Sequence, residues 1–149
     1  VLQEHNAVIY KGLEADDVLG IMATEPSNME RVIVSIDKDL KQIPSLISTD
    51  GKTVQKIDKK QADYWFMVQA MAGDSTDGYS GVPNVGVKTA QKLLGDNNVP
   101  LLDLWKKVLS AYDKAGYSAK EALQQARVAH ILKHKDYNKK TGKVKLWRI

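Results

Sequence analysis

Apolar residues in the first quarter of the chain predict a strand, a helix and a second strand. The run Ala7–Tyr10 reads as a short buried strand that ends at Gly12. Apolar side chains in 13–25 recur near the helical spacing, which predicts a helix. The β-branched run from Val32 to Ile36 predicts a strand covered on both faces, as in a parallel sheet. Strands that alternate with helices in this way favour an α/β fold.

The next segment predicts a hairpin followed by a long helix. Asp50-Gly51 lies between two strand-like stretches, a pattern typical of a β-hairpin turn. Residues 58–72 predict a helix that ends before Gly73. The side chains that we expect this helix to place in the core are Trp65, Phe66, Val68 and Met71.

The second half of the chain predicts short helices. One covers 87–94 and is closed by Gly95, a common helix-ending residue. A second starts near Pro100 and carries one apolar face. A third covers 118–135, and the serine and glutamate at its start have the spacing of a capping box.

The alternation in 142–149 predicts a final strand. A change from strands and helices to helices alone occurs near Gly73. We therefore expect two regions, an α/β part in residues 1–72 and a helical part in residues 73–149.

Charge is distributed unevenly along the chain, which has 149 residues and a net charge of +4. Residues 1–99 carry 10 Lys/Arg and 14 Asp/Glu, whereas residues 100–149 carry 12 and 4. This asymmetry favours a metal site beside a surface for a polyanion, with solvated charge runs as the alternative. The chain has no cysteine, which excludes disulfides, thiol catalysis and cysteine-bound zinc and fits a cytoplasmic protein. No apolar run approaches the length of a membrane span, so we expect no membrane partner.

Carboxylates gather in three clusters. Each cluster alone is typical of helix starts, loops or caps. However, the first two each follow a predicted strand, and the ends of parallel strands meet at one sheet edge. Oxygen ligands without histidine or cysteine suit Mg²⁺ or Mn²⁺, and two such ions roughly 4 Å apart can clamp a phosphodiester and activate water. The clustered residues are Glu14, Asp16, Asp17, Asp37, Asp39, Asp74 and Asp77.

The segment after the third cluster predicts a contact with phosphate. Gly81 and Gly86 permit tight turns and close approach by another molecule, and Pro83 fixes one backbone dihedral. The free N–H groups of the helix that follows favour an anion, and Lys88 and Thr89 can add contacts. An ordinary connection between two helices is the alternative. The spacing excludes a Walker P-loop.

The ordered motifs "EADD", "SIDKD" and "GDSTDGYSGVPNVGVKTA" resemble those of the structure-specific 5′ nucleases. This family includes flap endonucleases, the 5′-nuclease domain of bacterial DNA polymerase I and bacteriophage 5′–3′ exonucleases. The resemblance covers roughly Ala7 to Gly95, and the basic tail is most similar to the phage exonucleases. It implies a PIN-like α/β core with a partial parallel sheet, followed by a helix–three-turn–helix DNA-binding region.

The resemblance also implies roles for the acidic residues. Glu14, Asp16 and Asp17 match carboxylates that bind a first divalent cation, Mg²⁺ or Mn²⁺. The residues that match a second cation site are Asp37, Asp39, Asp74 and Asp77.

By the same resemblance, the residues that hold duplex DNA are Gly81, Val82, Pro83, Asn84, Val85, Gly86, Lys88 and Thr89. In relatives, backbone carbonyls of this hairpin also bind a potassium ion, and Val82 and Val85 are the equivalents here. Asn84 stands where the family often has glycine. Because asparagine tolerates left-handed backbone, we expect the turn to survive.

The family has an N-terminal part that supplies two further aspartates, a first strand and a helical arch. The chain therefore resembles the C-terminal portion, and the segment preceding it is an expected partner. The function that we expect is two-metal hydrolysis of DNA at 5′ ends, flaps or nicks in a bacterial or phage-infected cell. The alternatives are a non-catalytic DNA-binding module and a related metal-dependent RNase.

Overall fold

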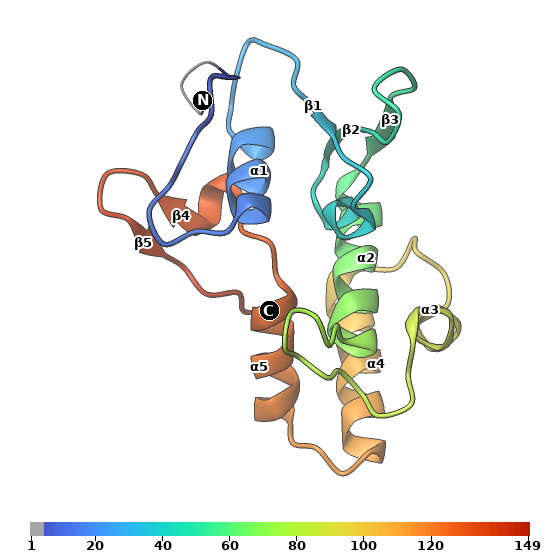
Figure 1. Cartoon of the computed structure of the whole chain (residues 1–149). Helices are drawn as coiled ribbons and strands as arrows, with labels where there is room; N and C mark the ends of the chain where they lie inside the picture. Colours follow the sequence, from blue (N-terminus) through green and yellow to red (C-terminus); the bar gives the residue numbers. More distant parts are fainter. Residues whose placement is uncertain (1–4) are drawn as a thin grey trace.

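The computed structural model describes residues 5–149, so the start of the chain lies outside the described residues. Strands and helices mix in the first half and helices dominate the second (Figure 1). In chain order the elements are α1 (Ala15–Thr24), β1 (Val32–Val34), the 3-10 helix η2 (Lys38–Gln42), β2 (Ser45–Ser48), β3 (Gln55–Ile57), α2 (Lys59–Ala72), α3 (Val87–Leu94), α4 (Leu101–Lys114), α5 (Ala119–Ala129), the 3-10 helix η3 (His134–Asp136), β4 (Tyr137–Asn138) and β5 (Lys143–Val144).

A small, partly parallel sheet carries the order β1-β2-β3. β1 pairs parallel with β2, and β2 pairs antiparallel with β3, which confirms the hairpin. The expectation that the first of these strands is covered on both faces is wrong. Ile33 is buried, but Val32 is 38% and Val34 65% exposed, so the side of β1 that carries these two residues faces solvent.

The predicted strand at Ala7–Tyr10 is also wrong. These residues form no strand, and Val8 and Ile9 are 49% and 74% exposed. Among residues 5–149, no strand pairs with this segment, so its β-branched side chains have no sheet in which to pack. The helix that follows is present as α1.

The long helix α2 joins the two halves of the core. Asp58 caps it in a capping box with Gln61, and Gly73 ends it, as the sequence predicts. Its buried side chains pack with α3, α4 and α5 in one apolar cluster. Ala62 on the same helix packs with the sheet residues in a second cluster. The hydroxyl of Tyr112 on α4 donates to the Ala70 carbonyl at 2.7 Å, which ties α4 to α2.

The third predicted helix is shorter than expected. Ser118 and Glu121 form the capping box, but α5 ends at Ala129 rather than continuing to residue 135. The amides of the next residues find partners elsewhere: Ile131 donates to the Gln42 side chain and Leu132 to Asp17, both at 2.9 Å. These tertiary hydrogen bonds replace the helical ones. The predicted final strand is limited to β5, which pairs with β4.

None of the helices among the described residues is long and apolar enough to cross a membrane.

Candidate active site

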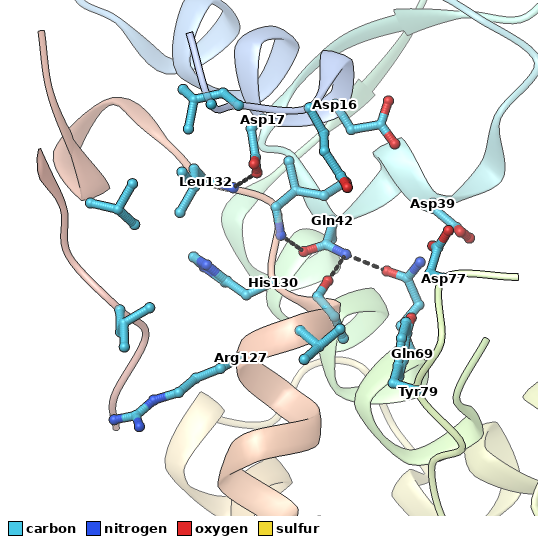
Figure 2. A pocket seen from close by; sticks show the side chains of 18 residues that line it. Asp16, Asp17, Asp39, Gln42, Gln69, Asp77, Tyr79, Arg127, His130 and Leu132 are labelled. Carbon is cyan, nitrogen blue, oxygen red and sulfur yellow. Dashed lines mark hydrogen bonds between the residues drawn. The ribbon is translucent and has the colours of Figure 1, made fainter. Parts of the chain in front are cut away.

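Three carboxylates meet at one point of the structure. Asp39, Asp74 and Asp77 each offer an oxygen, and these oxygens lie within 4.8 Å of one another. Asp39 lies on η2, just after β1, and the other two belong to the loop that follows α2. Figure 2 shows the side chains of Asp39 and Asp77 close together at the edge of a cavity of about 270 Å³.

The loop after α2 is held by its own backbone. Asp74 and Tyr79 exchange hydrogen bonds of 2.9 and 3.1 Å between their main chains. Gly73 and Gly81 have φ of +69° and +62° and lie back to back; a Cβ built on Gly81 would approach the Gly73 nitrogen to 2.4 Å. Only glycine fits such a contact between two backbones. These backbone contacts fix the conformation of the loop, and in this conformation Asp74 and Asp77 lie toward η2.

Asp39 is oriented by neighbours on two elements. The side chain of Asp37 accepts a hydrogen bond of 2.9 Å from the Asp39 amide and caps η2. Burial is the largest influence on the pKa of Asp39 and raises it, whereas the nearby Gln69 side chain on α2 has a smaller, lowering effect. The charges of Asp37 and Asp74 add to the effect of burial, so the pKa of Asp39 is raised overall.

Gln42 makes the central contacts of a buried hydrogen-bond network next to this cluster (Figure 2). Its side-chain amide donates to Gln69 at 2.6 Å and to the carbonyl of Ala129 at 2.8 Å. Its side-chain oxygen accepts from the Ile131 amide at 2.9 Å. The network links η2, α2 and the end of α5, so it fixes the elements that hold Asp39.

Asp16 extends the acidic surface from α1. Burial raises its pKa, and the charges of four aspartates raise it further: Asp37, Asp17, Asp39 and Asp77. Carboxylates held this close repel one another unless a cation neutralises them. The donor set contains oxygen only, which fits Mg²⁺ or Mn²⁺.

The other two residues of the first motif are placed differently. Asp17 accepts a hydrogen bond from the Leu132 amide at 2.9 Å, so it fastens α1 to the segment after α5 (Figure 2). Glu14 is exposed at the rim of the same cavity. The seven predicted carboxylates thus surround one region, but only Asp39, Asp74 and Asp77 form a close triad.

The route by which the clusters meet also differs from the expected one. The sequence predicts that two strand ends bring them together. Because residues 5–14, the described part of the chain before α1, form no strand, the first cluster approaches from the start of this helix and the second from η2. The aspartates meet across the space between a helix and a 3-10 turn.

The loop of the predicted DNA-binding motif leads directly into α3. Asn84 has φ of +61°, which confirms the expected left-handed turn. Pro83, Asn84, Gly86, Lys88 and Thr89 are exposed, Val85 is half-buried, and Gly81 and Val82 are buried. Gly86 starts α3 without a side-chain cap, so no side chain occupies the end where the free N–H groups lie.

Sequence reasoning missed Gln42, Gln69 and Tyr79. Gln42 and Tyr79 are buried and all three line the acidic cavity. The proximity of Asp39, Asp74 and Asp77 raises the pKa of Tyr79 further after burial. A polar Gln42 within the apolar series Leu40, Ile43 and Ile47 was the only sequence signal for the network.

Fold and site together define a mixed α/β protein with an acidic centre suited to a hard divalent cation and an open helix start suited to an anion. No family model matches the chain, and no solved structure does. Curated relatives do match. The exodeoxyribonuclease of Enterobacteria phage T3 is 33% identical over 168 residues, which cover 91% of this chain and 55% of that protein. The exonuclease of Escherichia phage T7 is 31% identical, covering 91% and 56%.

Bacterial relatives carry related names. A flap endonuclease Xni of Shewanella halifaxensis is 30% identical over 131 residues, covering 80% of this chain and 52% of that protein. A 5′–3′ exonuclease of Buchnera aphidicola is 36% identical over 95 residues. These relatives, named exonuclease, 5′–3′ exonuclease and flap endonuclease and 30–36% identical, support a member of the 5′ nuclease family. The chain spans about half the length of the phage relatives that it matches.

Proposed function

We propose that the protein takes part in metal-dependent 5′–3′ exonuclease or flap-endonuclease-like hydrolysis of DNA. The observation that carries this proposal is the triad of Asp39, Asp74 and Asp77, with oxygens within 4.8 Å, in a chain similar to named exonucleases. Carboxylates at this spacing are arranged to hold cations rather than to exchange protons with substrate. The relatives' sources favour the cytoplasm of a bacterial or phage-infected cell.

The carboxylates divide into two groups in this mechanism. Asp39, Asp74 and Asp77, with Asp37 beside them, would hold one Mg²⁺ or Mn²⁺, and Asp16, with Glu14 and Asp17, would contribute to a second. The chemistry that bound divalent cations would supply here is activation of the attacking water and stabilisation of the leaving 3′ oxygen, with a 5′ phosphate left on the product. The chain's own residues fix the geometry, since Gln42 and Gln69 keep Asp39 in place.

The exposed loop before α3 would bind the duplex part of the substrate as a helix–three-turn–helix element. Free N–H groups at the start of α3 attract phosphate, and Lys88 adds a positive charge. These contacts position the DNA without reading its sequence. The residues proposed for this surface are Gly81, Val82, Pro83, Asn84, Val85, Gly86, Lys88 and Thr89, with the carbonyls of Val82 and Val85 as candidate potassium ligands.

We further propose that another polypeptide segment completes the α/β part. The exposed side of β1 supports this: among residues 5–149 this strand lies at the edge of the sheet, its Val32 and Val34 are 38% and 65% exposed, and Ile36 just after it is 89% exposed. Strand edges of this kind are normally covered or paired. In this division, residues 1–72 belong to the nuclease core and residues 73–149 bind DNA.

A nuclease assay on 5′-flap and nicked duplexes, with Mg²⁺, with Mn²⁺ and with chelator, tests the proposal. We expect metal-dependent release of products with 5′ phosphates. In the protein with its completing segment, Asp74→Asn should lower cleavage roughly 100-fold or more, equivalent to about 3 kcal/mol of transition-state stabilisation. Its DNA affinity should stay within a few fold. Full activity in this variant would remove Asp74 from the chemistry.

The second candidate is a DNA-binding module without activity of its own. The observation that favours it is the exposed loop before α3 with its uncapped helix start, which could bind phosphate without the carboxylates. Binding without cleavage in every metal condition would support it. An RNA–DNA hybrid tested beside duplex DNA distinguishes a related RNase from a DNase.

A further inference from the structure

The β4–β5 hairpin lies beside α1, and the end of the chain reaches α5 (Figure 1). The Trp147 ring packs edge-on against Phe66 and Trp105, each at 5.0 Å between centroids. Its carbonyl accepts a hydrogen bond of 3.1 Å from Arg127. Tyr137 on β4 stacks on Tyr10 at 5.8 Å. The β4–β5 hairpin is therefore held in place next to the helix that carries Asp16.

The two sides of this hairpin differ in chemistry. Val144 and Leu146, which are 40% and 57% exposed, line the acidic cavity. Lys143 and Lys145 line a hollow of about 670 Å³, and Val144 lines this hollow as well as the acidic cavity, so the two adjoin at this residue. Val128 on α5, 56% exposed, adds to the apolar side.

The lysine side is strongly basic. Residues 133–148 contain seven Lys/Arg and one acidic residue, Asp136, whose buried side chain accepts from the Lys133 amide. Lys139 pairs with Glu25 at 2.6 Å. Within residues 5–149, no carboxylate lies within 4.0 Å of the ammonium groups of Lys140, Lys143 or Lys145.

We propose that the β4–β5 hairpin binds unpaired nucleotides of the DNA strand that reaches the carboxylate triad. This inference rests on the proposed function. Exposed lysines neutralise phosphates of any nucleic acid. The exposed aliphatic side chains of Val128, Val144 and Leu146 add a second feature, because they offer apolar contact to base faces. Those faces are free only in unpaired nucleotides, so the surface fits single-stranded DNA better than duplex.

Binding measured in chelator, where no cleavage occurs, tests the inference. The probes are fluorescently labelled oligothymidylate and a blunt duplex. The variant is Lys140→Gln/Lys143→Gln/Lys145→Gln, and the matched control is Lys52→Gln/Lys56→Gln/Lys120→Gln, three exposed lysines elsewhere. We expect the hairpin variant to bind oligothymidylate roughly tenfold more weakly, with a salt slope reduced by up to about 2, since each lost phosphate contact removes about 0.7. The duplex affinity should match that of the control.

A second variant tests the base contact. Leu146→Ser should weaken oligothymidylate binding without changing the salt slope, because it removes no charge. Circular dichroism would verify that both variants fold. Equal losses for oligothymidylate and duplex, or no loss beyond the control, would overturn the inference. If cleavage is absent in every metal condition but the variant still loses oligothymidylate binding, the proposed function fails and the inference stands.

Discussion

At the scale of residues, repulsion among the carboxylates of the acidic centre lowers the stability of the metal-free protein. Burial and neighbouring charge raise the pKa values of Asp16 and Asp39 above the ordinary 3.8. A raised carboxyl pKa means that the folded state favours the protonated form. The stability that this provides is present below pH 3.8 and is lost as the pH rises through the folded-state pKa.

Asp39→Asn should therefore stabilise the metal-free protein at neutral pH. Asparagine keeps the shape of the side chain and removes one of the repelling charges. In chelator at pH 7 we expect the melting temperature to rise by a few degrees, and we expect the difference to vanish below pH 3.8. Mg²⁺ should raise the melting temperature of the wild type more than that of the variant. A variant that melts lower in chelator at pH 7 would contradict the repulsion argument.

The sequence predicts the types of the site residues better than their arrangement. Acidic motifs at Asp39, Asp74 and Asp77 are visible because their spacing around turns is local. Gln42 and Gln69 are 27 residues apart and meet only through packing of η2 on α2. Asp17 similarly reaches Leu132 across 115 residues. Contacts at such separations leave no periodic trace in the sequence.

At the scale of elements, α1 approaches the segment after α5 unusually closely. A Cβ built on Gly20 would lie 2.2 Å from the Leu132 carbonyl oxygen and 2.9 Å from an Ile131 methyl group. Within a helix, alanine is normally more favourable than glycine by about 1 kcal/mol. At Gly20 the close contact should instead make alanine less favourable than glycine.

Gly20→Ala should destabilise the fold by about 1–3 kcal/mol, the usual cost of an overpacked contact. To make room for the added methyl group, α1 would have to move away from the segment after α5, which would take Asp17 away from the Leu132 amide. The affinity for the divalent cation should therefore fall as well. Urea unfolding measures the first effect. A neutral or stabilising result would contradict the close packing of α1.

The helix α3 carries the proposed phosphate contact. Lys88 is exposed in its first turn, beside the uncapped amides. Lys88→Ala should weaken duplex binding and reduce the slope of log affinity against log salt by about 0.9, the value for one phosphate contact in duplex DNA. Lys92→Ala, also on α3, is the control. An unchanged slope in the Lys88 variant would show that Lys88 makes no contact with phosphate.

Helices were the elements that the sequence predicted best. The periodic patterns and end signals of α2, α3 and α4 are local, so Asp58, Gly73 and Gly95 mark their ends correctly. The end of α5 was wrong because Gln42 and Asp17 capture the next amides. The strand at Ala7–Tyr10 was wrong because β-propensity requires a neighbouring strand to be realised.

At the scale of the whole molecule, opposite charges gather on adjacent surfaces. Several of the carboxylates line one cavity, and the lysines of the β4–β5 hairpin line a hollow that shares Val144 with it. Such an arrangement attracts a polyanion while cations hold its backbone at the acidic centre. The proposed nuclease function depends on the carboxylates binding divalent cations.

Direct measurement of Mn²⁺ binding, by electron paramagnetic resonance of the free ion, tests that claim without requiring activity. We predict saturable binding by the wild type and an affinity at least about tenfold lower in Asp77→Asn, which removes one ligand of the triad. The control, Asp103→Asn, removes an exposed carboxylate that pairs with Lys106 on α4 and should bind as the wild type does. Equal affinity in the wild type and in Asp77→Asn would contradict the account.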